Sequence, residues 1–389
     1  MTRVLRVLAL LLSLALAAAA CGGGEADLAE DATTTTTTTA ADDEAEAEST
    51  TTSADEAEAE EEAMEDEESS NEDIEPSSPS GPSFPLTGEI LGAGDDPSHA
   101  AVVVKISNND GTARQALDGL DEADIIFEER IEQEATRFLA VFHSSFPEQV
   151  GSIRSGRTSD INIVANLNRP VFGFSGANDG VHAQLRTADG DGILIRVSAD
   201  FGDPEFTRIG SFSAPDNMVA DVSRLLERAP EDSEPPQSLY DYSNNVTELG
   251  QRSPGVIVAA RSDAQYVWSE VDSGYLRFQG ENPLVTRDDV QITPKNVIIM
   301  TTTYLPSQVD ASSVDAVTIG QGPVEVYSNG FRVEGTWTRE FARDPYTLET
   351  ADGETIGLAP GQTWVSLAPA NTATELRPIE AQALRPTPG

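Results

Sequence analysis

Cysteine and histidine are almost absent from this sequence. One cysteine, Cys21, stands among 389 residues, and the three histidines, His99, His143 and His182, lie far apart. A single cysteine cannot form an intramolecular disulfide, and the histidines lack the HExxH or Cys-His spacing of a transition-metal site. We therefore expect no disulfide framework, no metal and no cofactor.

Basic residues are also scarce, with 24 Lys and Arg against 67 Asp and Glu, a formal charge of -43. Residues 22–82 contain 22 acidic and no basic residues, and residues 83–389 contain 45 acidic and 22 basic residues. Nucleic-acid affinity depends on neutralising phosphates, and no basic patch is visible in the sequence. We expect no nucleic-acid partner.

Long apolar runs are missing beyond the N-terminus. There, Arg3 and Arg6 precede an apolar run over 7–16, the small residues 17–20 and then Cys21, which is the pattern of a signal peptide. The alanines before Cys21 resemble a lipobox, although Ala18 stands where leucine is usual. We expect a signal peptide over 1–20, lipidation at Cys21 and an extracytoplasmic location on the cell membrane. Cleavage at an Ala-x-Ala site, with a free thiol, is the alternative.

The next segment cannot form a hydrophobic core. It combines a threonine run over 33–39 with acidic blocks and a Pro-Ser-Gly exit at 76–82. This composition indicates a disordered tether over 21–83. We expect the tether to be an unmodified spacer, and O-glycans on its Ser and Thr residues are the alternative.

Short apolar runs bounded by Gly, Pro, Asn and Asp begin at Phe84 and predict an α+β fold. We expect a mixed α/β N-terminal domain over 84–235, a mostly antiparallel, β-rich C-terminal domain over 254–370 and a flexible tail over 371–389. Expected strands cover 101–106, 124–127, 137–142, 171–174, 265–268, 275–278, 297–300, 314–319, 324–327, 331–337 and 363–367. Expected helices cover 158–167 and 217–228, the second with Asp216 as its cap.

Several motifs resemble the YerB-like lipoproteins, a two-part family of unknown function. They include the runs 85–88, 119–128, 136–142 and 151–157 in the first part, and 296–298, 320–322, 329–330, 335–337 and 361–364 in the second. The chain departs from the family pattern at 116–118, where proline-glutamine-serine is usual, and at Asp216, where histidine is usual. The resemblance implies an envelope lipoprotein and supplies no activity.

A polar, glycine-containing turn, Arg154 to Ser159, offers backbone N–H groups and two guanidinium groups suited to a carboxylate or phosphate. Internal pairing of these arginines with the acidic run from Glu128 to Glu134 is the alternative. The candidate ligand-binding residues are Glu128, Glu132, Arg137, Arg154, Ser155, Arg157 and Asn217.

We expect a non-enzymatic envelope binding or scaffold protein whose partner is a peptide, a glycan or another protein. No catalytic residue is assigned, because no complete catalytic set is visible in the sequence. The competing hypothesis is a cell-wall polymer hydrolase or transferase, in which Glu128 or Glu132 acts as acid/base and Arg154 and Arg157 orient an anionic group. Trp268, Trp337 and Trp364 are expected in the core rather than on a sugar-stacking surface.

Overall fold

The computed structural model describes residues 81–385. The expected signal peptide, Cys21 and the tether up to residue 80 lie outside the described residues. The body has few helices and many strands, so its fold is α+β with a β-rich character. None of the helices within 81–385 has both the length and the apolar character needed to cross a bilayer.

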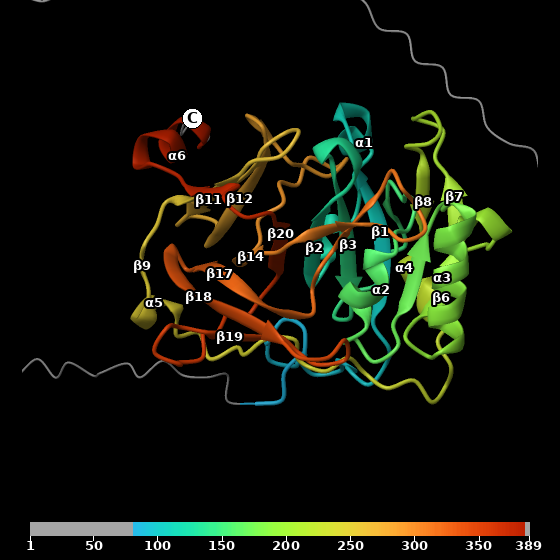
Figure 1. The fold of residues 1–389 in the computed structure, drawn as a ribbon, viewed down its shortest axis with the longest axis horizontal. Helices are drawn as coiled ribbons and strands as arrows, with labels where there is room; N and C mark the ends of the chain where they lie inside the picture. Colours follow the sequence, from blue (N-terminus) through green and yellow to red (C-terminus); the bar gives the residue numbers. More distant parts are fainter. Residues whose placement is uncertain (1–80, 386–389) are drawn as a thin grey trace, which may run out of the picture. The chain divides into compact units, whose positions relative to one another are not determined.

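The central sheet is built from both halves of the chain (Figure 1). Its order is β19-β18-β17-β14-β20-β2-β3-β1-β5-β6, and β9 pairs with β18. Strand β2 pairs in parallel with β20, so Ile126 lies opposite Trp364 although the two residues are far apart in the sequence. The strands are β1 Val102–Asn108, β2 Ile125–Arg130, β3 Thr136–Phe142, β5 Val171–Phe174, β6 Ile195–Ser198, β9 Gln251–Arg252, β14 Asn296–Thr301, β17 Gly320–Ser328, β18 Phe331–Arg339, β19 Thr347–Glu349 and β20 Thr363–Ala368.

Three smaller sheets complete the β structure. The largest has the order β13-β12-β11-β10-β21, and the others are β4-β8-β7 and β15-β16. Their strands are β10 Gly255–Val258, β11 Ala264–Ser269, β12 Gly274–Gln279, β13 Asn282–Pro283 and β21 Ala373–Glu375, then β4 Val150–Gly151, β7 Phe206–Arg208 and β8 Met218–Ala220, and β15 Tyr304–Pro306 with β16 Val314–Ala316.

Short helices connect and cover these strands. The longest, α3, has Asn178 as its cap and buries Val181, Leu185 and Ala188, which recur at helical spacing. The sequence reasoning missed α3. The helices are α1 Gly111–Gln115, α2 Ser159–Val164, α3 Asp179–Gly190, α4 Val222–Leu226, α5 Val246–Leu249 and α6 Pro378–Leu384, the last of which lies within the segment expected to be a flexible tail.

The helix predicted over 217–228 is wrong in its first half. Residues 218–220 form strand β8, which pairs with β7 and β4, and helix α4 begins only at Val222. The cap is Asp221, whose side chain accepts the backbone N–H of Arg224 at 3.0 Å, rather than Asp216. Long-range strand pairing therefore overrides the local apolar spacing that favoured a helix.

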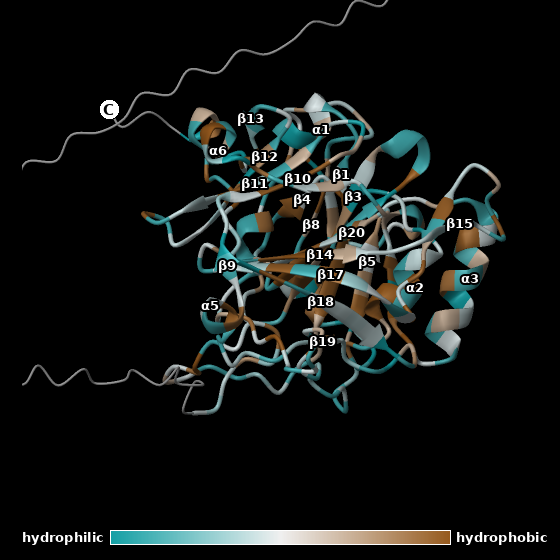
Figure 2. Ribbon diagram, turned by 60° about the vertical axis from the view of Figure 1, so that its left-hand side comes forward, coloured by the Kyte–Doolittle hydropathy of each residue, from teal (hydrophilic) through white to brown (hydrophobic). Residues whose placement is uncertain are grey.

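The central strands are buried on both faces, and the hydropathy colouring shows them as the apolar interior (Figure 2). Along β2, Ile125 and Phe127 belong to one core cluster and Ile126 to the other, because successive side chains point to opposite faces. Trp337 and Trp364 are buried in these cores, as the sequence predicted. The same alternation places Glu128 and Glu129 on opposite faces.

Candidate functional site

Glu128 lies at the meeting point of strands from both halves of the chain and is 3 % exposed. Its carboxylate accepts hydrogen bonds from Thr136 Oγ1 at 2.7 Å and from Tyr266 Oη and Trp364 Nε1 at 3.1 Å each. Arg277 Nη2 forms an ion pair with Glu128 Oε2 at 3.1 Å. The Arg277 guanidinium also lies 4.9 Å from the ring centre of Tyr266 and 5.1 Å from that of Trp364. Cation–π contacts with these two rings stabilise the buried guanidinium of Arg277.

Glu129, on the opposite face of β2, belongs to a second buried charge cluster. Lys105 forms ion pairs with Glu129 and with Asp160, the latter at 2.6 Å, and all three side chains are at most 1 % exposed. Ser159 Oγ donates to Glu129 Oε2 at 2.6 Å. Burial, and then the charge of Glu129, raises the pKa of Asp160 to about 7 despite the lysine. This cluster fixes helix α2 to the sheet.

Most of the sequence-predicted site residues surround this second cluster, where they pair internally. Glu132 binds Arg157 through two hydrogen bonds, of 3.0 and 2.9 Å. Arg137 Nη1 donates to the backbone carbonyl of Ser155 at 2.9 Å, and burial together with the charges of Arg157 and then Arg154 lowers the pKa of Arg137 to about 10.

Of the remaining predicted residues, Arg154 adjoins this group, because its backbone N–H donates to the carbonyl of Lys105 at 2.8 Å, and Glu128 and Asn217 lie apart from it. Arg154 Nε is 3.7 Å from Asp216 Oδ1, and Asn217 Oδ1 accepts a hydrogen bond from Arg208 at 2.6 Å. Glu128 is on the other face of the sheet. The structure therefore brings Glu132, Arg137, Ser155 and Arg157 together, and it places Glu128 and Asn217 elsewhere.

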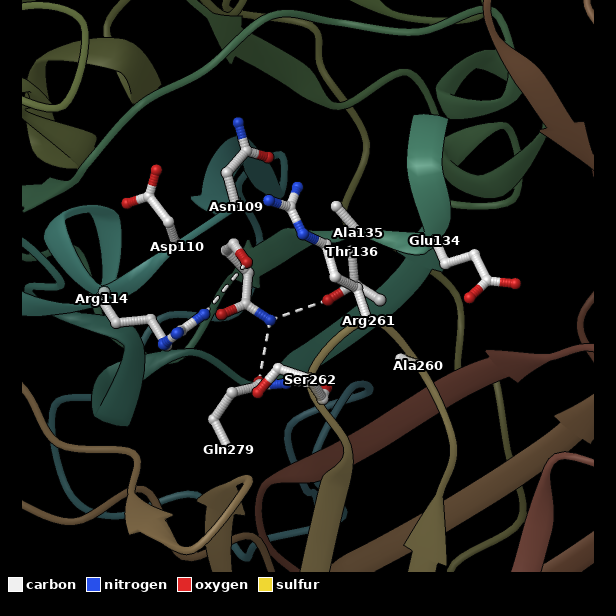
Figure 3. A pocket seen from close by; sticks show the side chains of 12 residues that line it. Asn109, Asp110, Arg114, Glu134, Ala135, Thr136, Ala260, Arg261, Ser262 and Gln279 are labelled. Carbon is white, nitrogen blue, oxygen red and sulfur yellow. Dashed lines mark hydrogen bonds between the residues drawn. The ribbon is translucent and has the colours of Figure 1, made fainter.

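A polar pocket of about 210 Å³ lies where the two halves meet, and we call it the junction pocket (Figure 3). One wall is formed by the segment after strand β1 and by the start of strand β3. The other wall is formed by the β10–β11 turn and the end of β12. The lining residues are Asn108, Asn109, Asp110, Gly111, Arg114, Glu134, Ala135, Thr136, Ala260, Arg261, Ser262 and Gln279.

The floor of the junction pocket is connected to the buried Glu128–Arg277 pair. Asn108 Nδ2 donates to Thr136 Oγ1 at 2.7 Å and to Gln279 Oε1 at 2.9 Å. Thr136 donates onward to Glu128, and Gln279 Oε1 also accepts from Arg277 Nη2 at 3.0 Å. Because Arg277 fixes the orientation of the Gln279 amide, it also fixes which end of the Asn108 amide faces Gln279. The floor is therefore preorganised.

A second hollow, of about 550 Å³, is larger but less suited to a specific ligand. All its lining residues come from the C-terminal half, and its Arg332 already pairs with Glu325 at 2.8 Å and Glu334 at 2.5 Å. None of its lining side chains leaves a buried polar atom without a partner within 81–385. The junction pocket has such an atom, so we regard it as the candidate site.

The sequence reasoning missed the main pocket residues. The run from Asn108 to Gly111 does carry a signal, because a cluster of Asn, Asp and Gly after an apolar strand marks a turn. Arg114 follows this turn directly, in helix α1, and was overlooked. Arg261 and Gln279 carry no signal, since only contacts between distant segments bring them to this turn. Within 81–385 no group of three His, Cys, Asp or Glu side chains is arranged to hold a metal ion.

Comparison with family models defines the class of protein. Residues 86–235 match the model described as "Protein of unknown function (DUF3048) N-terminal domain". Residues 256–365 match the corresponding "Protein of unknown function (DUF3048) C-terminal domain". The chain belongs to this two-part YerB-like family.

A particular relative is the Bacillus subtilis (strain 168) protein named "Putative lipoprotein YerB". It is 26 % identical over 291 residues, which cover 69 % of this chain and 81 % of the relative. The crystal structure of YerB protein from Bacillus subtilis matches with a TM-score of 0.64 and 22 % identity, over 76 % of this chain and 99 % of that chain. The structural likeness shows that the fold is shared.

Proposed function

We propose that the protein is a membrane-anchored, extracytoplasmic lipoprotein that binds a peptide, glycan or protein of the cell envelope in the junction pocket. The observation that carries this proposal is the pocket itself, because both halves of the chain line it and its floor is held by a buried hydrogen-bond network. Ligand sites commonly lie where two structural units meet and present a few fixed polar groups.

The anchor is supported by the signal-peptide pattern before Cys21 and by the name of the Bacillus relative. Replacing Cys21 by serine removes the sulfur that lipidation requires. We expect C21S to move from the membrane fraction to the soluble extracytoplasmic fraction, measured by fractionation and immunoblotting. Retention of C21S in the membrane would contradict the lipid anchor.

Binding at the junction pocket is tested by filling the pocket. Ala260 is half-buried on its wall, so A260W introduces an indole there, whereas A351W introduces the same indole at an exposed position of the second hollow. After crosslinking in cells, we expect full-length A260W to lose the envelope component that the unaltered chain captures and A351W to keep it. Equal capture by A260W, with an unchanged circular dichroism spectrum, would refute the assignment of this pocket.

The contacts of Glu128 and Glu132 give no support to the hydrolase or transferase alternative. Glu128 is buried beneath the pocket and binds three neutral donors and a guanidinium, and Glu132 is engaged by Arg157. A general acid or base must reach a substrate atom to within hydrogen-bond distance. Binding is therefore the function that the geometry supports best.

A further inference from the structure

Two arginines of the junction pocket have no carboxylate partner. Neither Arg114 nor Arg261 lies within 4.0 Å of an acidic oxygen in the part of the chain that the structure describes, although acidic residues outnumber basic ones. The only side-chain hydrogen bond of Arg114 there is a long one, 3.4 Å, to the backbone carbonyl of Asn108. Figure 3 shows both guanidinium groups reaching into the pocket, while the carboxylates of Asp110 and Glu134 point away from it.

The charges around Arg114 favour an anion in the pocket. Burial lowers the pKa of Arg114, and after the opposing effect of Asp110 the like charges of Arg277 and Arg261 lower it further. A negative group beside Arg114 and the exposed Arg261 relieves their repulsion and replaces the water that Arg114 loses on burial. The guanidinium geometry matches a carboxylate, which it can bind through two parallel hydrogen bonds.

The pocket also holds two side-chain acceptors that have no donor within the described residues. Asn108 is 3 % exposed, and its Oδ1 has no hydrogen-bond partner among residues 81–385; the same holds for the Oδ1 atom of Asn109. A buried acceptor without a donor costs free energy. An anion made only of acceptor oxygens leaves these atoms unpaired, whereas the last residue of a peptide carries an N–H one carbon away from its carboxylate.

The size of the pocket fits the end of a chain. Its volume of about 210 Å³ far exceeds the space that one water needs, ~10–15 Å³. It is smaller than the ~300–1,000 Å³ of pockets that enclose whole small molecules. The end of a chain fits this volume, with the rest of the ligand extending into solvent.

We propose that the junction pocket binds the C-terminal end of a peptide, with Arg114 and Arg261 binding the carboxylate and Asn108 Oδ1 accepting the last peptide N–H. This inference rests on the proposed function, because it names the ligand class for the same pocket. It assigns a role to two arginines that the fold leaves unpaired.

The experiment is a calorimetric titration of the full chain with acetyl-dialanine in the all-L and all-D forms. Three matched probes accompany it: the C-terminal amide, the ester in which lactate replaces the last alanine, and inorganic phosphate. We expect the free acid of one form to bind at least ~10-fold more tightly than its amide and its ester, because the amide loses the charge and the ester loses the N–H. We expect phosphate to bind more weakly than that acid.

Variants locate the binding. R114Q and R261Q each remove one cationic fork, so each weakens binding of the acid at least ~10-fold, whereas R186Q, at an exposed position of α3, leaves it unchanged. Equal affinity for acid and amide, equal or tighter binding of phosphate, or no binding of either acid overturns this inference. Those results do not affect the test of the proposed function, in which A260W loses envelope capture. The proposed function is overturned separately, by equal capture with A260W.

Discussion

Two neighbouring glutamates of strand β2 show how differently the two faces of the central sheet accommodate buried charge. Glu128 has an arginine of its own, Arg277, and three neutral donors. Glu129 shares the ammonium of Lys105 with Asp160. The first face balances one anion with one cation, and the second holds two carboxylates around one lysine. The balanced pair lies beneath the binding pocket, whereas burial in the unbalanced cluster raises the pKa of Asp160 to about 7.

Removing the shared lysine is the strongest way to disturb this comparison. K105M leaves two carboxylates buried without a cation, and breaking buried pairs costs about 3–5 kcal/mol. We expect urea unfolding at pH 7 to show a loss of that size. K295M is the matched control, because Lys295 Nζ is exposed and only donates to the carbonyl of Ser273 at 2.6 Å. A loss below about 1 kcal/mol for K105M would contradict the account of this cluster.

Removing Arg277 should cost less than removing Lys105. Thr136, Tyr266 and Trp364 continue to donate to Glu128 in R277M, so we expect a loss of about 3 kcal/mol, measured by the same unfolding experiment. The double variant R277M/E128Q no longer buries a lone charge and should regain part of this loss. If the double variant is as unstable as the sum of its single variants, the two residues do not act as a pair.

The unbalanced cluster predicts a pH dependence of stability. Because the folded pKa of Asp160 is raised from 3.8 to about 7, the folded state retains a proton that the unfolded chain has released. This contribution is fully present below about pH 3.8 and is lost as the pH rises through about 7, by at most ~1.4 kcal/mol per pH unit. We expect the unfolding free energy of D160N, measured from pH 4 to 8, to lack this fall. Parallel curves for D160N and the unaltered chain would show that Asp160 does not titrate there.

The pocket arginines should have the smallest effect on stability. R114Q and R261Q break no ion pair within the described residues, so we expect each to change the unfolding free energy by less than about 0.5 kcal/mol. Thermal unfolding of the two variants beside R186Q checks this. A loss above about 2 kcal/mol would mean that these arginines hold the fold together.

Local patterns in the sequence predicted individual elements better than they predicted the site. Strand β5 has its predicted bounds, 171–174, because Val and Phe between a proline and a polar turn leave little choice. Helix α2 is shorter at both ends than the predicted range 158–167. Helix α3 was missed because Gly180 and the polar surface of the helix weaken the helical signal. The helix expected from Asn217 failed where strand pairing competed with it.

The site was harder to predict because it depends on contacts between distant segments. Alternation along β2 is readable in the sequence, and it separates Glu128 from Glu129. The partner of Glu128 is not readable, since Arg277 lies 149 residues further along the chain. By contrast, Arg157 and Glu132 are 25 residues apart, and their pairing was an alternative that the sequence left open.

Hydrogen exchange of the full chain, with and without solubilised envelope peptides, tests most directly whether the junction pocket is the binding site. The account predicts slower exchange in segments 108–116 and 259–263, which form its two walls, and no change at 249–252 and 350–354 in the second hollow. Protection confined to the second hollow, or to the turn at 154–159, would contradict the assignment of the junction pocket.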